Sequence, residues 1–214
     1  MRTPSQPSDK AVALNRFGLG ATPDAADIAP RAWLAEQLRR YDPHPAALSA
    51  LSDGREAVLA YRAERQQMRK DGASQPGEKA DVKSARADLQ AVYRQAVQAR
   101  LACAVQTDTP FVERLVHFWS NHFCVSGEQP EVAALAGAFE RDAIRPHVLG
   151  RFQDMLLAVE RHPAMLIFLN QDKSIGPDSP AAVRAAQKSP ERQRGLNENL
   201  GREMLKEYVR DGES

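Results

Sequence analysis

The chain has 214 residues, of which 43% are hydrophobic and 27% charged, and its 29 Lys and Arg against 28 Asp and Glu give a formal charge of +1. This length and composition indicate one soluble globular domain, and the near-neutral charge argues against a nucleic-acid-binding protein. The two cysteines, Cys103 and Cys124, are too few for the disulfide framework of a small secreted protein, so we expect free, buried thiols.

Neither a targeting signal nor a membrane span is expected. The polar segment at residues 1–10 is not followed by the apolar stretch that a secretory signal requires. The longest apolar run, residues 164–169, is far shorter than the roughly 20 residues of a transmembrane helix. Without an export signal, the default location is the cytoplasm.

Helical periodicity extends over most of the chain, and no alternating run typical of a strand occurs in the sequence. The first helices are predicted over residues 11–17 and from Thr22-Pro23-Asp24 to about residue 40. A charged helix over 55–69 and a longer one over 81–106 are expected to form an antiparallel pair, joined by an exposed loop at 70–80. Apolar residues at every fourth position make one ridge on the longer helix: Leu89, Tyr93, Val97, Leu101 and Val105.

The helical pattern continues through the second half of the chain. The predicted segments are helices over 111–123, 130–143, 152–161 and about 196–210, with a short apolar segment at 164–169. Residues 171–195 are predicted to be an exposed loop, with a helical turn or two over 181–187. We therefore predict an all-α fold, an irregular multi-helix bundle with a long antiparallel helix pair and no sheet, in a single domain of residues 1–214.

The helix over 111–123 carries the first candidate site. At about 100° per residue, His122 lies near the middle of an apolar arc, and His117 lies on the polar side with Glu113 and Asn121. His117 and His122 point about 140° apart, so they cannot bind one metal ion from a straight helix, which excludes a zincin-type motif. The arc consists of Phe111, Val112, Leu115, Phe118 and Trp119.

Two interpretations of His122 stay open. The first is a neutral core histidine that bonds to a carbonyl or a carboxylate. The second is a general base or a single metal ligand, assisted by Asn121 and paired with Glu203 or Glu198. Weak candidates for metal binding are therefore His122 and Glu203, whereas no cofactor is expected.

The second candidate site lies at the start of the last helix. Glu198 and Arg202 are four residues apart, as are Asn199 and Glu203, so each pair shares one side of the helix. Glu203 lies close to the apolar face, where a carboxylate has to be paired or protonated. Either Glu203 belongs to the catalytic pair, or this segment forms a structural polar network, made by Asn197, Asn199 and Arg202.

Both candidate sites resemble a known family. Glu113-Arg114 with Phe118-Trp119-Ser120-Asn121-His122-Phe123 looks like the "ER…FWxNHF" signature of the bacterial domain of unknown function 1800 family. Blocks at 145–152, 162–166 and 197–203 resemble the family's later blocks in order. Its opening is similar to residues 14–18 with Thr22-Pro23.

The resemblance implies a helical protein, often from Gram-negative bacteria, often exported, and often encoded beside a second family of sulfatase-like character. It implies no established reaction, cofactor or catalytic residue. This chain departs from the family by lacking an export signal, by a longer polar segment before Asn197, and by ending soon after Lys206-Glu207. We interpret it as the N-terminal part of a longer family architecture.

Two functional hypotheses follow. The first is an accessory or partner-binding module whose partner is another bacterial protein encoded nearby, with no nucleic acid and no membrane span. The alternative is a hydrolase-like enzyme that uses His122 with Glu203 or Glu198, with or without a metal ion. Because the sequence contains no recognised catalytic motif, we favour the first hypothesis.

Overall fold

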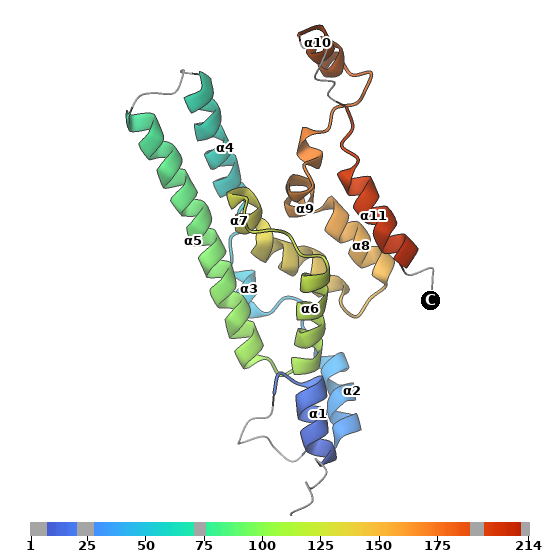
Figure 1. Ribbon diagram of the computed structural model, residues 1–214. Helices are drawn as coiled ribbons and strands as arrows, with labels where there is room; N and C mark the ends of the chain where they lie inside the picture. The colour runs from blue at the N-terminus through green and yellow to red at the C-terminus, as the bar shows by residue number, and fades with distance from the viewer. Residues whose placement is uncertain (1–7, 21–27, 71–75, 189–194, 211–214) are drawn as a thin grey trace, which may run out of the picture.

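The computed structural model describes residues 8–20, 28–70, 76–188 and 195–210. Within these ranges every regular element is helical and no strand occurs, which confirms the predicted all-α fold (Figure 1). The α-helices are α1 (Asp9–Phe17), α2 (Pro30–Arg40), α3 (Ala46–Ser49), α4 (Arg55–Lys70), α5 (Pro76–Gln106), α6 (Pro110–His122), α7 (Pro130–Phe139), α8 (Phe152–Arg161), α9 (Pro163–Phe168), α10 (Pro180–Lys188) and α11 (Asn199–Arg210). Three short elements are the π-helix η1 (Glu140–Ile144) and the 3-10 helices η2 (Arg145–His147) and η3 (Gln171–Lys173).

Proline sets the start of several helices. A proline at the first helical position gives up no intrahelical hydrogen bond, and its fixed φ suits the helix. The predicted starts of α6 and α7 are confirmed at such positions, and α2 and α9 also begin with a proline. The cap of α6 comes from another helix, α2. Thr109 makes no side-chain cap, and Gln37 Oε1 instead accepts a hydrogen bond from the Phe111 N–H at 2.6 Å.

Of two predicted boundaries in the first half, one lies outside the described residues and one differs from the prediction. Thr22-Pro23-Asp24, predicted to open the second helix, lies outside the described residues, and α2 begins at Pro30. The predicted loop at 70–80 is too long, because α5 already begins at Pro76. A proline such as Pro76 can open a helix as readily as it can break one, so composition alone did not decide between a helix start and a loop.

The second half also differs at two places. The predicted loop at 171–195 holds η3 and α10, and α10 lies where a turn or two of helix was expected. The last helix begins at Asn199 instead of near residue 196. Asn197 Oδ1 accepts a hydrogen bond from the Asn199 N–H at 3.0 Å, and such a bond satisfies a free donor at the start of the helix.

The predicted long antiparallel pair is confirmed as α4 and α5, which lie side by side in Figure 1. The predicted ridge of α5 turns to the core only at Leu89, which is 1% exposed. The other four residues of the ridge are exposed, and the buried face of α5 instead follows a line in which all side chains but Leu89 are small. That line consists of Ala85, Leu89, Ala96 and Cys103.

The small residues of α5 allow a close crossing with α7. A Cβ atom placed on Gly137 of α7 would lie 2.4 Å from the Ala96 Cβ atom, a distance that real Cβ atoms essentially never show. A glycine on α7 is therefore required for the two helices to approach this closely. The crossing fixes α7 against α5 and positions the residues that follow α7.

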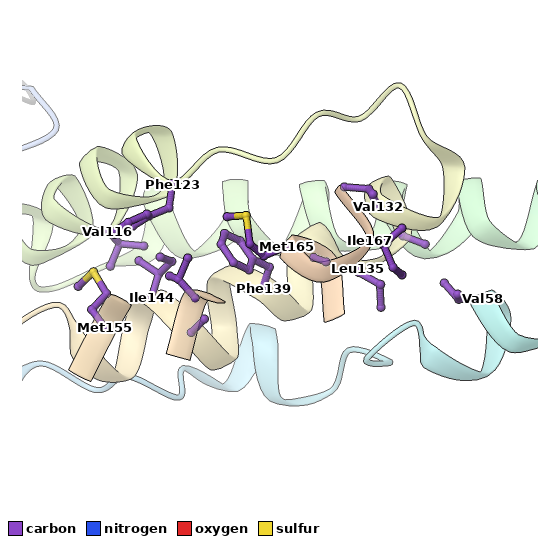
Figure 2. Close-up of a cluster of buried hydrophobic side chains, with 14 of the residues drawn as sticks. Val58, Val116, Phe123, Val132, Leu135, Phe139, Ile144, Met155, Met165 and Ile167 are labelled. Atoms are coloured by element: carbon purple, nitrogen blue, oxygen red, sulfur yellow. The ribbon is translucent and has the colours of Figure 1, made fainter. Parts of the chain in front are cut away.

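The hydrophobic core is formed by side chains of α4 to α9 and of η1, part of which Figure 2 shows. Side chains from separate helices interdigitate there, among them Val116 of α6, Leu135 of α7, Met155 of α8 and Met165 of α9. Each is at most 6% exposed. Burial of this apolar surface stabilises the fold at roughly 25 cal/mol per Å².

The α-helix predicted over residues 130–143 ends at Phe139, and the chain continues as the π-helix η1. The Arg145 N–H donates to the Glu140 carbonyl oxygen, a bond between residues five apart. Pro146 cannot donate a helical hydrogen bond, and η2 follows as a single 3-10 turn. This irregular segment brings Glu140 and Arg145 to the same side of the chain.

His162 caps α9 and is buried. Its Nδ1 accepts a hydrogen bond from the Ala164 N–H at 3.1 Å, and its ring makes an edge contact with Phe139. Burial lowers the pKa of His162 to about 4. The unfolded chain takes up this proton near pH 6.5, so between these values it binds more protons than the folded protein. We expect stability to fall as the pH falls from about 6.5 to 4, by at most about 1.4 kcal/mol per pH unit.

Urea denaturation at several pH values tests this expectation, with the substitution His162→Asn as its control. Asparagine keeps an acceptor for the Ala164 N–H but does not titrate. The slope of stability against pH between 6.5 and 4 should be smaller in this variant. An unchanged slope would assign the pH dependence to other groups.

Candidate functional site

A buried ion cluster joins α6, η1 and η2. The Arg145 guanidinium makes a two-bond contact with Glu113, at 2.9 Å from Nη1 to Oε2 and 2.6 Å from Nη2 to Oε1. It also donates to Glu140 Oε1 from Nε at 3.1 Å and from Nη2 at 3.0 Å. The exposed fractions of the three side chains are 1% for Arg145, 3% for Glu113 and 8% for Glu140.

Other side chains complete this cluster, which we call the Arg145 network. Glu140 Oε2 forms an ion pair with Arg100, 2.8 Å from its Nε, and accepts a hydrogen bond from the Ser120 hydroxyl at 3.2 Å. The Tyr41 hydroxyl donates to the Arg145 carbonyl oxygen at 3.1 Å, and His117 Nε2 lies 3.5 Å from Glu113 Oε1. The network therefore ties the chain after α2 to α5, α6, η1 and η2.

Glu113 and Arg145 keep their charges at neutral pH. Burial alone would raise the pKa of Glu113, but contacts with His117 and Arg145 lower it to about 2. Burial would lower the pKa of Arg145, but the two carboxylates raise it above its ordinary value. Burial raises the pKa of Tyr41 to about 12. A carboxylate with so low a pKa is a poor proton acceptor near neutral pH.

The sequence analysis placed Glu113 on the polar side of its helix, and this was wrong. Val112 and Val116 are both fully buried, so the buried face of α6 includes Glu113 between them. Phe118, assigned to the apolar arc, is 57% exposed. The sequence did contain an indication that Glu140 is buried. Glu140 follows Val132 and Ala136 at four-residue spacing, which places its carboxylate in line with apolar positions.

His122 lies at the C-terminal end of α6 among aromatic rings. The ring centroid of Phe123 is 4.7 Å away, that of Trp119 5.4 Å and that of Phe118 6.3 Å. His122 is half-buried, whereas the adjacent Asn121 is exposed and lines a cavity between α5 and α7. The role of His122 as a general base assisted by Asn121 stays a prediction.

The residues predicted at the last helix lie on α11 and in the segment before it. Asn197 Nδ2 donates to the carbonyl oxygens of Leu169, at 3.2 Å, and Asn170, at 3.3 Å, and the Asn197 N–H donates to the Ser174 hydroxyl at 2.8 Å. Asn197 thus attaches the start of α11 to the chain that follows α9. Arg202 donates to Asn199 Oδ1 within the helix.

The two candidate acids differ in exposure. Glu203 is half-buried on α11, and Glu198 is exposed one position before the helix begins. Their pairing with His122, in catalysis or in metal binding, stays a prediction. Among the described residues, no three His, Cys, Asp or Glu side chains are grouped so that they could hold a metal ion.

Both cysteines are free thiols, as predicted. Cys103 is buried, and burial raises the pKa of its thiol. Cys124 was expected to be buried as well, but it is exposed just after α6, although its neighbours Phe123 and Val125 pack on the core. In the described part of the chain, no helix has the length and apolar character needed to cross a membrane.

An exposed apolar line on α5 lies beside a cavity. We call this line, Tyr93, Val97, Leu101 and Val105, the α5 stripe; its residues are 43%, 38%, 61% and 85% exposed, respectively. The cavity has a volume of about 310 Å³ and lies between α5, α7 and the chain that joins α6 to α7. Tyr93 and Val97 line it, so stripe and cavity are continuous.

Comparison with known proteins identifies the family. The family model described as "Protein of unknown function (DUF1800)" matches residues 12–206. No curated protein and no solved structure matches the chain. The family match covers the α5 stripe, the Arg145 network and both predicted sites. The resemblance found in the sequence is thereby confirmed, and the chain belongs to the DUF1800 family.

Proposed function

We propose that this protein is a partner-binding module that docks an amphipathic helix of another protein on the α5 stripe. The observation that carries the proposal is the exposure of four large apolar side chains in one line on a well-packed helix. Residues four apart are displaced by only about 40° around an α-helix, so the stripe forms a continuous ridge. Such ridges fit the grooves of a second helix.

Charge around the stripe indicates the chemistry of the partner. From residue 89 to residue 107 the chain contains no Asp or Glu, and Arg94 lies beside the stripe, as does Arg100, whose charge is already paired with Glu140. A complementary helix would present apolar residues flanked by Glu or Asp. Paired rim charges would add specificity more than affinity, because solvent screens them.

The cavity beside the stripe supplies an anchor point. It is bordered by Val125 and Ala136 as well as by Tyr93 and Val97, and its volume of about 310 Å³ can accept an apolar side chain. Binding energy in protein interfaces concentrates at such buried anchors. A partner residue inserted there would fix the register of the docked helix along α5.

Binding of designed peptides tests the proposal. One amphipathic helical peptide carries Leu in an apolar line with Glu on both flanks, and a matched peptide carries Lys on the flanks. We expect the Glu peptide to bind more tightly. The variant Leu101→Glu should weaken its binding about 30-fold, the loss typical of a residue central to an interface. Titration calorimetry measures both effects.

The matched control is Leu59→Glu on α4, because Leu59 is 67% exposed and lies outside the stripe. This variant should bind the Glu peptide as the unmodified protein does. Equal losses in the two variants would contradict the proposal. A concentration-dependent dimer in sedimentation would also contradict it if Leu101→Glu abolished that dimer. The occupant of the stripe would then be a second copy of the chain.

A further inference from the structure

A second cavity lies on another part of the molecule, between α4, the start of α7 and η3. We propose that this α4 cavity, with a volume of about 340 Å³, binds the dianion of a small phosphate monoester. The site is separate from the α5 stripe, and the proposal does not depend on the proposed function. Its recognition elements are three arginines of α4 and one lysine of η3: Arg62, Arg65, Arg69 and Lys173.

The three arginines share one side of α4. Their spacing of three and four residues places Arg62, Arg65 and Arg69 within an arc of about 60° around the helix axis. Lys173 lines the same cavity from η3. Four cations on two walls therefore border a single cavity.

The charge balance selects a dianion. Two carboxylates also line the cavity, Glu131 and Asp172, so four cations and two carboxylates leave a net charge of +2. A phosphate monoester carries about −1.5 to −2 at neutral pH, which matches this charge. The whole chain has a formal charge of only +1, so the cavity is a local concentration of positive charge.

The arginines keep donors for a ligand. Arg62 makes a 2.9 Å contact with Asp172 through Nη2, and Arg65 Nη1 lies 3.8 Å from Glu131, beyond hydrogen-bond distance. No carboxylate in the described part of the chain forms an ion pair with Arg69. Each guanidinium has five N–H donors in a fork that fits tetrahedral oxyanions.

The size of the cavity favours a small ligand. Sites for small molecules range from about 300 to 1,000 Å³, and the α4 cavity lies near the lower end. It can hold a phosphate group with a short attached body. The side chains of Arg62 and Arg65 are 41% and 42% exposed, so a ligand can reach them from solvent.

Titration calorimetry with glycerol phosphate and with sulfate tests the choice of a phosphate monoester. The second pKa of a phosphate monoester is about 6, so lowering the pH from about 7.5 to 5.5 should weaken its binding about fourfold. Sulfate stays a dianion, and its binding should not change. No histidine lines the cavity, so the ligand is the group that titrates. An equal pH effect on both ligands would overturn the assignment.

Variants of opposite sign test the site itself. Arg69→Gln should weaken glycerol phosphate binding about tenfold, and Asp172→Asn should tighten it, because a lining carboxylate is removed. The matched control is Arg86→Gln, an exposed arginine of α5 that does not line the cavity; it should change binding less than twofold. Leu101→Glu should leave this binding unchanged.

Three results would overturn the proposal. The first is no binding of glycerol phosphate at about 10 mM and low ionic strength. The second is an equal effect of Arg69→Gln and Arg86→Gln, which would indicate a general charge effect. The third is much tighter binding of a phosphoserine peptide than of free phosphoserine, which would assign the site to a phosphorylated protein instead of a small molecule.

Discussion

Replacement of Arg145 by methionine is expected to lower the free energy of unfolding by about 3–5 kcal/mol. The variant would leave two buried carboxylates near each other without their shared cation. Glu140 would keep Arg100 and Ser120, but Glu113 would keep only its contact with His117. Urea denaturation followed by circular dichroism measures the loss.

The pH dependence of the same variant gives a second readout. In the unmodified protein the pKa of Glu113 is lowered to about 2, so its contribution to stability is complete above about pH 4.5 and is lost as the pH falls toward 2. Without Arg145 the main positive charge beside Glu113 is absent, and its pKa should rise. Acid unfolding should therefore begin at a higher pH in the variant.

Two controls separate buried charge from general effects. Arg151 lies in the same region but is exposed, and Arg151→Met should change stability by less than about 0.5 kcal/mol. A triple variant with Glu113→Leu, Glu140→Leu and Arg145→Met should recover much of the loss, because no buried charge then lacks a partner. A triple variant that is less stable than Arg145→Met would contradict this explanation.

Replacement of Gly137 by valine is expected to cost about 3 kcal/mol, the upper part of the range for overpacking. The cause is the crossing of α5 and α7, where even one added carbon would lie 2.4 Å from the Ala96 Cβ atom. Helix propensity alone predicts the opposite sign, because valine is a better helix former than glycine. The sign of the change in unfolding free energy therefore decides between the two effects.

Gly201 is the matched control for this prediction. It is also a glycine within a helix, but an added Cβ atom at Gly201 would have no neighbour within 4 Å. Gly201→Val should be neutral or slightly stabilising. A second substitution, Ala96→Gly, should recover at least about 1 kcal/mol in the Gly137→Val background if the two sites clash directly. Additive effects of the two substitutions would contradict the close crossing.

Periodicity and proline positions predicted most of the helices, the antiparallel pair and the absence of a sheet. They could not decide which of two apolar lines on α5 faces the core. The line through Leu101 has the larger side chains, but the line through Ala96 is buried, because a close crossing with α7 requires small residues. That choice depends on a residue of another helix, Gly137, which no window along α5 contains.

The Arg145 network was beyond the sequence analysis for a similar reason. Residues 144–151 were predicted to lie between two helices, and such connections are usually exposed. Arg145 is buried because Glu113, 32 positions earlier, and Glu140 both reach it. Local patterns describe one helix at a time, whereas the partners of a buried charge come from several.

The π-helix η1 shifts the rotational phase of the chain. A π turn holds one residue more than an α turn, so the chain after Ile144 emerges at a different angle than an uninterrupted α-helix would give. Both α7 and α8 contribute side chains to the same core, and the chain between them changes direction within η1 and η2. This segment is where the chain places Glu140 and the cation that neutralises it.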